Sequence, residues 1–179
     1  MKAAVVFESM FGNTQKVAEA IGRGLSSAFE TAVIEVGHAP DGLADGVDLL
    51  VVGGPTHAFG MSRPSTRKSA VEQRGQRGWT PVSSSDGVRE WLDALSKAKG
   101  VKAAAFDTRV PRKGFLSFGS AARGIASELN KRGFKLVADP EGFLVLGTEG
   151  PLAERELERA EEWGRAIASS ATAAQATAA

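Results

Sequence analysis

The chain has 179 residues, 42% of them hydrophobic, which is enough for one core between a central sheet and covering helices. Its 22 Lys and Arg residues nearly balance 21 Asp and Glu residues, so the net charge of +1 implies no global attraction to nucleic acid or to an anionic membrane. The chain has no cysteine, which excludes disulfides, thiolate nucleophiles and cysteine-ligated metals, so redox chemistry would need a bound organic cofactor.

The sequence contains no clear motif for a metal site or for a membrane-spanning segment. The two histidines, His38 and His57, lie far apart without the spacing of a helical metal motif, and we expect no metal site. The N-terminal apolar run ends at Glu8 without a small-residue cleavage site, and no apolar stretch approaches the roughly 20 residues of a membrane helix. These features predict a soluble cytoplasmic protein that does not act at a membrane.

Near-continuous apolar runs alternate with helical patterns, which is typical of parallel strands buried on both faces. Residues 2–7 are the first predicted strand, and residues 14–28 are a helix with apolar side chains at three- and four-residue spacing. Residues 31–35 are a short second strand. Residues 48–55 are a third strand, which ends in a turn at Pro55 because proline cannot continue a central ladder.

Residues 61–85 show no clear periodicity, and we predict a long basic surface loop there. Asp86 is expected to cap the next helix. The fourth strand is predicted at residues 101–106. A second long loop over 107–119 precedes a helix over 120–132.

The fifth predicted strand is residues 143–146, with residues 135–138 as a candidate first half. A last helix over 152–168 completes one domain, residues 1–168, and the Ala/Thr-rich segment 169–179 is expected to be a disordered tail. This order predicts a doubly wound, five-stranded parallel sheet with helices on both faces. Ligands of such sheets bind beyond the carboxyl ends of the strands, so the loops after strands one, three and four are the candidate site.

The first of these loops, Ser9-Met10-Phe11-Gly12-Asn13-Thr14, turns sharply from strand into helix. Such a turn directs unpaired backbone N–H groups and the positive end of the helix dipole at one point, which favours a phosphate monoester. The loop has neither the Gly-x-Gly-x-x-Gly pattern of NAD sites nor the Gly-Lys-Ser/Thr pattern of ATP sites. The alternative interpretation is that Ser9 and Asn13 simply cap the helix.

This loop resembles the FMN-phosphate loop of flavodoxins, and Gly53-Gly54-Pro55-Thr56-His57-Ala58-Phe59-Gly60-Met61 resembles the flavodoxin-type domains of flavin oxidoreductases. The resemblance implies the strand order 2-1-3-4-5, noncovalently bound FMN, and two loops that enclose the isoalloxazine ring. The cofactor-binding residues that it implies are Ser9, Met10, Phe11, Gly12, Asn13, Thr14, Pro55, Thr56, His57, Ala58, Phe59, Gly60, Asp107, Thr108, Arg109 and Gly119.

The sequence departs from familiar flavodoxins in two ways. Phe11 stands where many of them have a second Ser or Thr. The chain also has no Tyr, and basic residues are expected around the ring where familiar carriers are acidic. Positive charge near a reduced flavin tends to raise the two-electron potential, so we predict that the protein is not a low-potential shuttle. The basic residues are Arg63, Arg67, Lys68, Arg109, Arg112 and Lys113, and the candidates for stacking on the ring are His57, Phe59, Trp79 and Phe115.

The alternatives for function stay open at this point. The protein is an electron-transfer flavoprotein or an FMN-dependent oxidoreductase of the small NAD(P)H:quinone type, acting with a redox partner protein or a small-molecule electron acceptor. A deazaflavin is a second candidate ligand, which a basic rim would suit. A phospho-acceptor signalling domain is disfavoured because the strand ends lack clustered Asp, and a nucleic-acid role is disfavoured because aromatic residues are not interleaved with the basic ones.

Overall fold

A computed structural model describes residues 1–57, 60–75, 80–111 and 119–176 of the chain. At its centre is a sheet whose pairings are all parallel, in the order β2-β1-β3-β4-β5, with β6 beside β4. The predicted order 2-1-3-4-5 is confirmed. The strands are β1 (Lys2–Phe7), β2 (Glu30–Glu35), β3 (Leu49–Pro55), β4 (Lys102–Arg109), β5 (Lys135–Leu136) and β6 (Glu141–Leu144).

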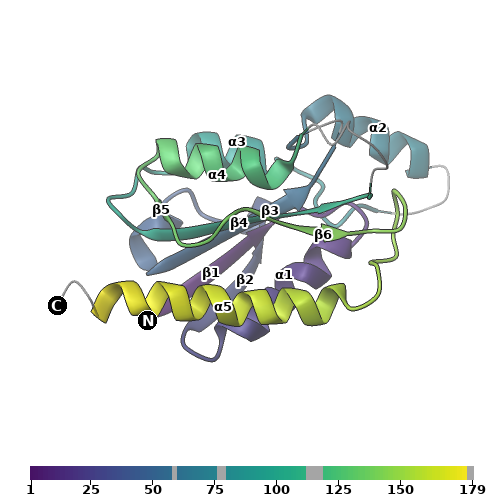
Figure 1. The fold of residues 1–179 in the computed structure, drawn as a ribbon. Helices are drawn as coiled ribbons and strands as arrows, with labels where there is room; N and C mark the ends of the chain where they lie inside the picture. The colour runs from purple at the N-terminus through teal and green to yellow at the C-terminus, as the bar shows by residue number, and fades with distance from the viewer. Residues whose placement is uncertain (58–59, 76–79, 112–118, 177–179) are drawn as a thin grey trace.

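Helices cover both faces of the sheet (Figure 1). On one face, α1 (Asn13–Leu25) and α5 (Glu156–Ala176) pack on alternate strand residues such as Val5 and Phe106. On the other face, α3 (Val88–Ala94) and α4 (Ala121–Lys131) pack on residues such as Val52. This doubly wound arrangement leaves the carboxyl ends of the strands uncovered, which is where such sheets bind ligands. Two short 3-10 helices, η1 (Val36–His38) and η2 (Leu43–Gly46), connect β2 to β3.

The fifth strand position is divided into two short strands. β5 pairs with the start of β4, and β6 pairs with its end, where Phe143 lies opposite Thr108. Pro140 lies between β5 and β6, and proline has no N–H to donate to a ladder, so the pairing is interrupted there. The predicted strand over 143–146 therefore begins and ends two residues earlier in the structure, as β6.

Residues 64–75 and 169–176 are helical where the sequence predicted a loop and a disordered tail. Helix α2 (Pro64–Gly75) occupies part of the segment that was predicted to be a loop. The only buried side chain of this helix over residues 64–72 is the charged Arg67, so the sequence has no apolar stripe from which the helix could be predicted. Helix α5 continues to Ala176 instead of ending at Ala168, because Ala171 is fully buried and its carbonyl accepts a hydrogen bond from Lys102 Nζ. The helix therefore includes most of the segment expected to be a disordered tail.

The N-terminus of α3 is capped differently from the prediction. Gly87, and not Asp86, is the N-cap residue, and its backbone N–H donates to Glu90 Oε2 at 3.0 Å. The next N–H, of Val88, donates to Glu8 Oε2 at 2.9 Å. A buried carboxyl from the end of β1 therefore satisfies part of the first turn of α3. No helix within the described ranges is both long and apolar enough to cross a membrane.

Candidate functional site

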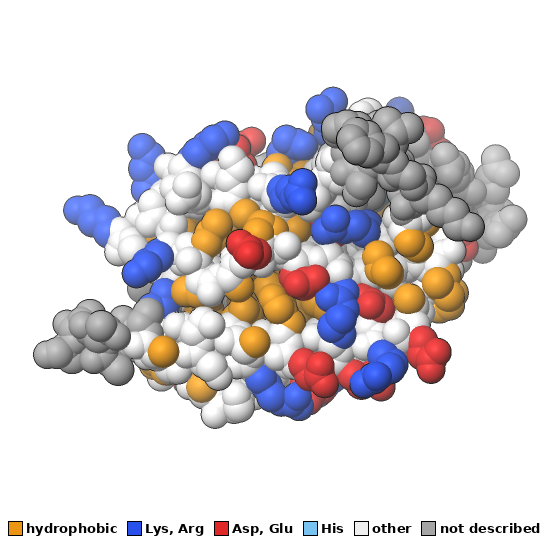
Figure 2. Space-filling model, viewed as in Figure 1, with side chains coloured by type: hydrophobic (Ala, Val, Ile, Leu, Met, Phe, Trp, Pro, Cys, Tyr) orange, Lys and Arg blue, Asp and Glu red, His pale blue; other side chains and the backbone are white. Residues whose placement is uncertain are grey.

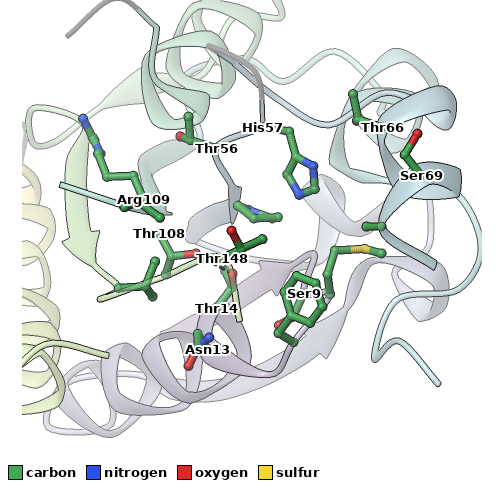
Figure 3. Close-up of a pocket in the computed structure, with 16 residues that line it drawn as sticks. Ser9, Asn13, Thr14, Thr56, His57, Thr66, Ser69, Thr108, Arg109 and Thr148 are labelled. Carbon is green, nitrogen blue, oxygen red and sulfur yellow. Dashed lines mark hydrogen bonds between the residues drawn. The ribbon is translucent and has the colours of Figure 1, made fainter. Parts of the chain in front are cut away.

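A pocket of about 340 Å³ opens at the carboxyl ends of β1, β3 and β4 (Figure 3). This volume lies in the range of roughly 300–1,000 Å³ that small-molecule sites occupy. Among the described residues, the lining of this pocket is rich in hydroxyl groups, contains no carboxylate, and has one Lys or Arg side chain, that of Arg109. The lining residues are Ser9, Met10, Phe11, Asn13, Thr14, Pro55, Thr56, His57, Thr66, Ser69, Ala70, Thr108, Arg109, Val110, Val145 and Thr148.

The loop from β1 to α1 forms one end of this pocket. Gly12 has a φ of 83°, a left-handed conformation that glycine adopts without a Cβ penalty, and its N–H donates to Ser9 Oγ at 3.0 Å. No side chain caps α1. The Asn13 amide instead donates to the Glu149 carbonyl at 3.0 Å. Within the described chain, the first-turn N–H groups of α1 are therefore left for a ligand, which the capping alternative did not anticipate.

Segment 82–83 holds this loop in place. The Ser9 N–H donates to Ser83 Oγ at 2.9 Å, and the Ser83 N–H donates back to the Ser9 carbonyl at 2.8 Å. The Val82 N–H donates to the Met10 carbonyl at 3.3 Å. Ser9 and Ser83 are both buried, so these backbone bonds are shielded from water. Sequence reasoning missed this contact, because a run of serines in a loop carries no pairing signal.

Thr14 and Thr108 join the first loop to the end of β4. Their hydroxyl oxygens lie 2.8 Å apart in a buried hydrogen bond, and both residues line the pocket. One hydroxyl of the pair donates to the other, so the accepting hydroxyl keeps its own proton for a further acceptor. The Ser9 hydroxyl is similar, since its oxygen accepts from Gly12 and its proton remains available. These groups are donors directed at the same end of the pocket (Figure 3).

Asp107 does not line the pocket, although the sequence predicted that it contacts the cofactor. It is fully buried, and its Oδ2 accepts hydrogen bonds from Thr56 Oγ1 at 3.0 Å, Ser120 Oγ at 2.7 Å and the Ala122 N–H at 3.0 Å. Its Oδ1 accepts from Arg109 Nε at 2.6 Å. Asp107 thus anchors the start of α4 and orients two side chains, those of Thr56 and Arg109, that do line the pocket.

The loop after β3 is closed by reciprocal backbone hydrogen bonds. The His57 N–H donates to the Gly60 carbonyl at 2.8 Å, and the Gly60 N–H donates to the His57 carbonyl at 2.9 Å. His57 lines the pocket, and its burial, together with the charge of Arg67, lowers the pKa of the imidazole. Gly12, Gly60 and Gly119 are not among the lining residues. Ala58 and Phe59, and the stacking candidates Trp79 and Phe115, lie outside the described residues.

Two parts of the lining were not predicted. Thr66, Ser69 and Ala70 come from α2, which had no periodic signal, so the sequence offered no way to find them. Val145 and Thr148 follow β6, at the carboxyl end of the fifth strand position. The same strand-end argument that selected the other three loops would have selected this one.

The basic residues predicted to surround the ring are largely paired with carboxylates where the structure describes them. Arg67 lies 3.1 Å from Glu90, the exposed Lys68 lies 3.8 Å from Glu72, and Arg109 pairs with Asp107. Arg63 is exposed, and Arg112 and Lys113 are outside the described residues. The positive potential expected around the ring is therefore reduced by these neighbours. Acidic and basic side chains also lie beside one another along the N-terminal half of α5 (Figure 2).

Comparison with known proteins places this pocket in a family. The family model described as flavodoxin matches residues 5–163. No curated protein matches the chain in sequence. Solved structures of similar fold include a flavodoxin from the domain Archaea, with 24% identity and a TM-score of 0.66 over 96% of this chain and 99% of that one.

Oxidised Flavodoxin 2 from Bacillus cereus is similar at 20% identity and a TM-score of 0.65, over 94% of this chain and 99% of that one. The flavodiiron protein from Giardia intestinalis is also 20% identical, with a TM-score of 0.60, and the match covers 96% of this chain but 36% of that one. The family match spans the strands and loops that build the pocket. This chain therefore belongs to the flavodoxin family of flavin-binding electron-transfer proteins.

Proposed function

We propose that the chain binds FMN noncovalently in the 340 Å³ pocket and passes electrons between the flavin and a redox partner. The observation that carries this proposal is the N-terminus of α1, which has no side-chain cap and faces a pocket whose described lining has several hydroxyl donors and no carboxylate. Backbone N–H groups and hydroxyls of this kind favour a dianionic phosphate, which a carboxylate would repel.

The phosphate would be held without a lysine or arginine of the loop itself. The N–H groups of Asn13 and Thr14 belong to the first turn of α1, where the helix dipole favours negative charge. The hydroxyl of Ser9 and the Thr14–Thr108 pair supply the remaining donors. These neutral groups compensate for the hydroxyl that many flavodoxins have at the position of Phe11.

The ring would lie between two strand ends. Pro55, Thr56 and His57, at the end of β3, and Arg109 and Val110, at the end of β4, all line the pocket. Figure 3 shows Thr56 close to Arg109. FMN, when bound, supplies reversible one-electron and two-electron chemistry, while the protein supplies binding, orientation and electrostatics. Arg109, held by Asp107, would place one guanidinium near the cofactor, and the lowered pKa of His57 favours its uncharged imidazole.

The first experiment is the visible spectrum of the purified protein and the mass of any chromophore released on denaturation. The mass distinguishes FMN from a deazaflavin. Oxidation of NAD(P)H in the presence of a quinone then distinguishes a reductase from an electron carrier. If no chromophore is released and none binds on reconstitution, the proposal is wrong.

The second experiment compares FMN with riboflavin, which lacks the phosphate. The Thr14→Val variant should weaken FMN binding roughly ten- to a hundred-fold, the effect of one lost hydrogen bond to a charged group, and should change riboflavin binding little. Thr31→Val, on the edge strand β2 and away from the pocket, is the matched control. Equal effects of Thr14→Val on both ligands would contradict a phosphate site at this loop.

A further inference from the structure

Helix α2 forms one wall of the flavin pocket, yet the hydrophobic core does not hold it. Thr66, Ser69 and Ala70 line the pocket, but neither apolar core cluster includes an α2 residue over the described side chains. Val71, the largest apolar side chain of the helix, is 37% exposed. Figure 1 shows α2 set apart from the layers of the sheet and the other helices. Another interaction must therefore keep this wall in place.

A second cavity, of about 550 Å³, lies along the neighbouring face of the same helix. Its lining includes Pro64, Lys68 and Val71 from α2, and Ser83 and Asp86 from the segment opposite. Helix α2 thus has a hollow along each of two faces, and neither hollow is filled by apolar side chains. Among the described side chains of α2, apolar packing does little to oppose displacement of the helix, which is typical of segments that open locally.

Arg67 is the exception on this helix, because its side chain is buried while its neighbours are not. Its Nη1 donates to Ser62 Oγ at 2.9 Å and lies 3.1 Å from Glu90 Oε2 on α3. Glu8 Oε2, just after β1, also lies beside Gly87. A Cβ on Gly87 would lie 2.6 Å from this oxygen and would also collide with Arg67 Nη1. The absence of a side chain at Gly87 leaves room for the Glu8 carboxyl and the Arg67 guanidinium beside each other.

We propose that Arg67 is a positioning residue, which latches α2 over the flavin pocket by joining it to Ser62 and to Glu90 of α3. Thr66 and Ser69 face the pocket only while this latch is closed. The claim that α2 helps to retain the flavin rests on the proposed function. The latch itself is a property of the protein without cofactor.

Arg67 also acts on the pocket through its charge. His57 lines the pocket, and the charge of Arg67 adds to burial in lowering the pKa of the imidazole. The guanidinium therefore couples the position of α2 to the protonation of a pocket residue. A side chain that served only to fill space would have no such effect on His57.

The test compares Arg67→Met with Lys68→Met. Methionine keeps much of the length of either side chain and removes the charge, and Lys68 is an exposed neighbour on the same helix whose only described ion pair is the 3.8 Å contact with Glu72. In the protein without cofactor, Arg67→Met should speed amide hydrogen exchange in α2 by roughly ten- to a hundred-fold, the effect of losing one charged hydrogen bond. The pKa of His57, measured by NMR, should rise.

The FMN complex provides the second readout. Arg67→Met should raise the FMN dissociation rate by at least several-fold, while Lys68→Met leaves the exchange, the His57 pKa and the dissociation rate near those of the unmodified protein. Glu90→Gln removes the charge of the partner but keeps a hydrogen-bond acceptor for Gly87, and should shift exchange in the same direction as Arg67→Met. The double variant should then show less than the sum of the two effects.

These readouts separate the latch from the cofactor assignment. If exchange in α2 is no faster in Arg67→Met than in Lys68→Met, the latch is refuted, whatever the protein binds. If exchange and the His57 pKa change as expected, the latch is supported even where FMN binding fails, and only the proposed function falls. Faster exchange with an unchanged dissociation rate would overturn the claim that α2 retains the flavin.

Discussion

Asp107 provides the sharpest test of how the fold builds the site, because one carboxylate orients two pocket residues and the start of a helix. Asp107→Ala removes the acceptor for Thr56, Arg109, Ser120 and the Ala122 N–H together. Asp107 is fully buried, whereas the Arg109 side chain is 29% exposed and can regain water. Breaking a buried charged pair costs about 3–5 kcal/mol when one partner is left behind.

The expected loss of unfolding free energy is therefore about 3 kcal/mol, at the lower end of that range because Arg109 is rehydrated. For a chain of this size it corresponds to a fall in Tm of roughly 6–12 °C, measured by circular dichroism. Asp93→Ala is the control. Asp93 pairs with Arg132 at 3.2 Å but its side chain is 70% exposed, so we expect a loss of less than about 1 kcal/mol. Equal losses in the two variants would refute the anchoring role of Asp107.

Two further variants test the buried carboxyl of β1 and the helix crossing. Burial raises the pKa of Glu8 above its ordinary value of 4.5, so the folded state holds this proton to a higher pH than the unfolded state does. The contribution of Glu8 to stability should therefore be lost as the pH rises above 4.5. Glu8→Gln, which cannot ionise, should flatten this part of the plot of Tm against pH. Parallel plots for the variant and the unmodified protein would contradict the reasoning. A Cβ at Gly24 would lie 2.8 Å from the Arg165 backbone nitrogen of α5, so Gly24→Ala should cost about 1–3 kcal/mol in urea denaturation. Gly46→Ala meets no atom within 4 Å and is the control; similar losses in both would exclude close helix packing as the cause.

The order of elements could be predicted from local patterns. Apolar runs such as residues 49–52 and the spaced apolar face of α1 indicate directly which side chains must leave water, and the spacing of these side chains distinguishes strand from helix. The loop Ser9–Thr14 could be recognised for the same reason, since a strand that turns into a helix leaves N–H groups unpaired by its own geometry. Local patterns therefore predicted the doubly wound sheet and one end of the pocket, whereas the order of the strands in the sheet was implied by the resemblance to flavodoxins.

Tertiary structure decided what depends on residues distant in sequence. Helix α2 is held by Arg67, a charged residue, so no apolar period could reveal it. The burial of Asp107 depends on donors at Thr56 and Ser120, which lie 51 and 13 residues from it along the chain. The apolar periodicity of one segment indicates which of its side chains are buried. The partner that compensates a buried charge depends on how different segments pack together. For this chain, the sequence located the Ser9–Thr14 loop at one end of the pocket, and the packing of α2 supplied a wall that no local pattern predicted.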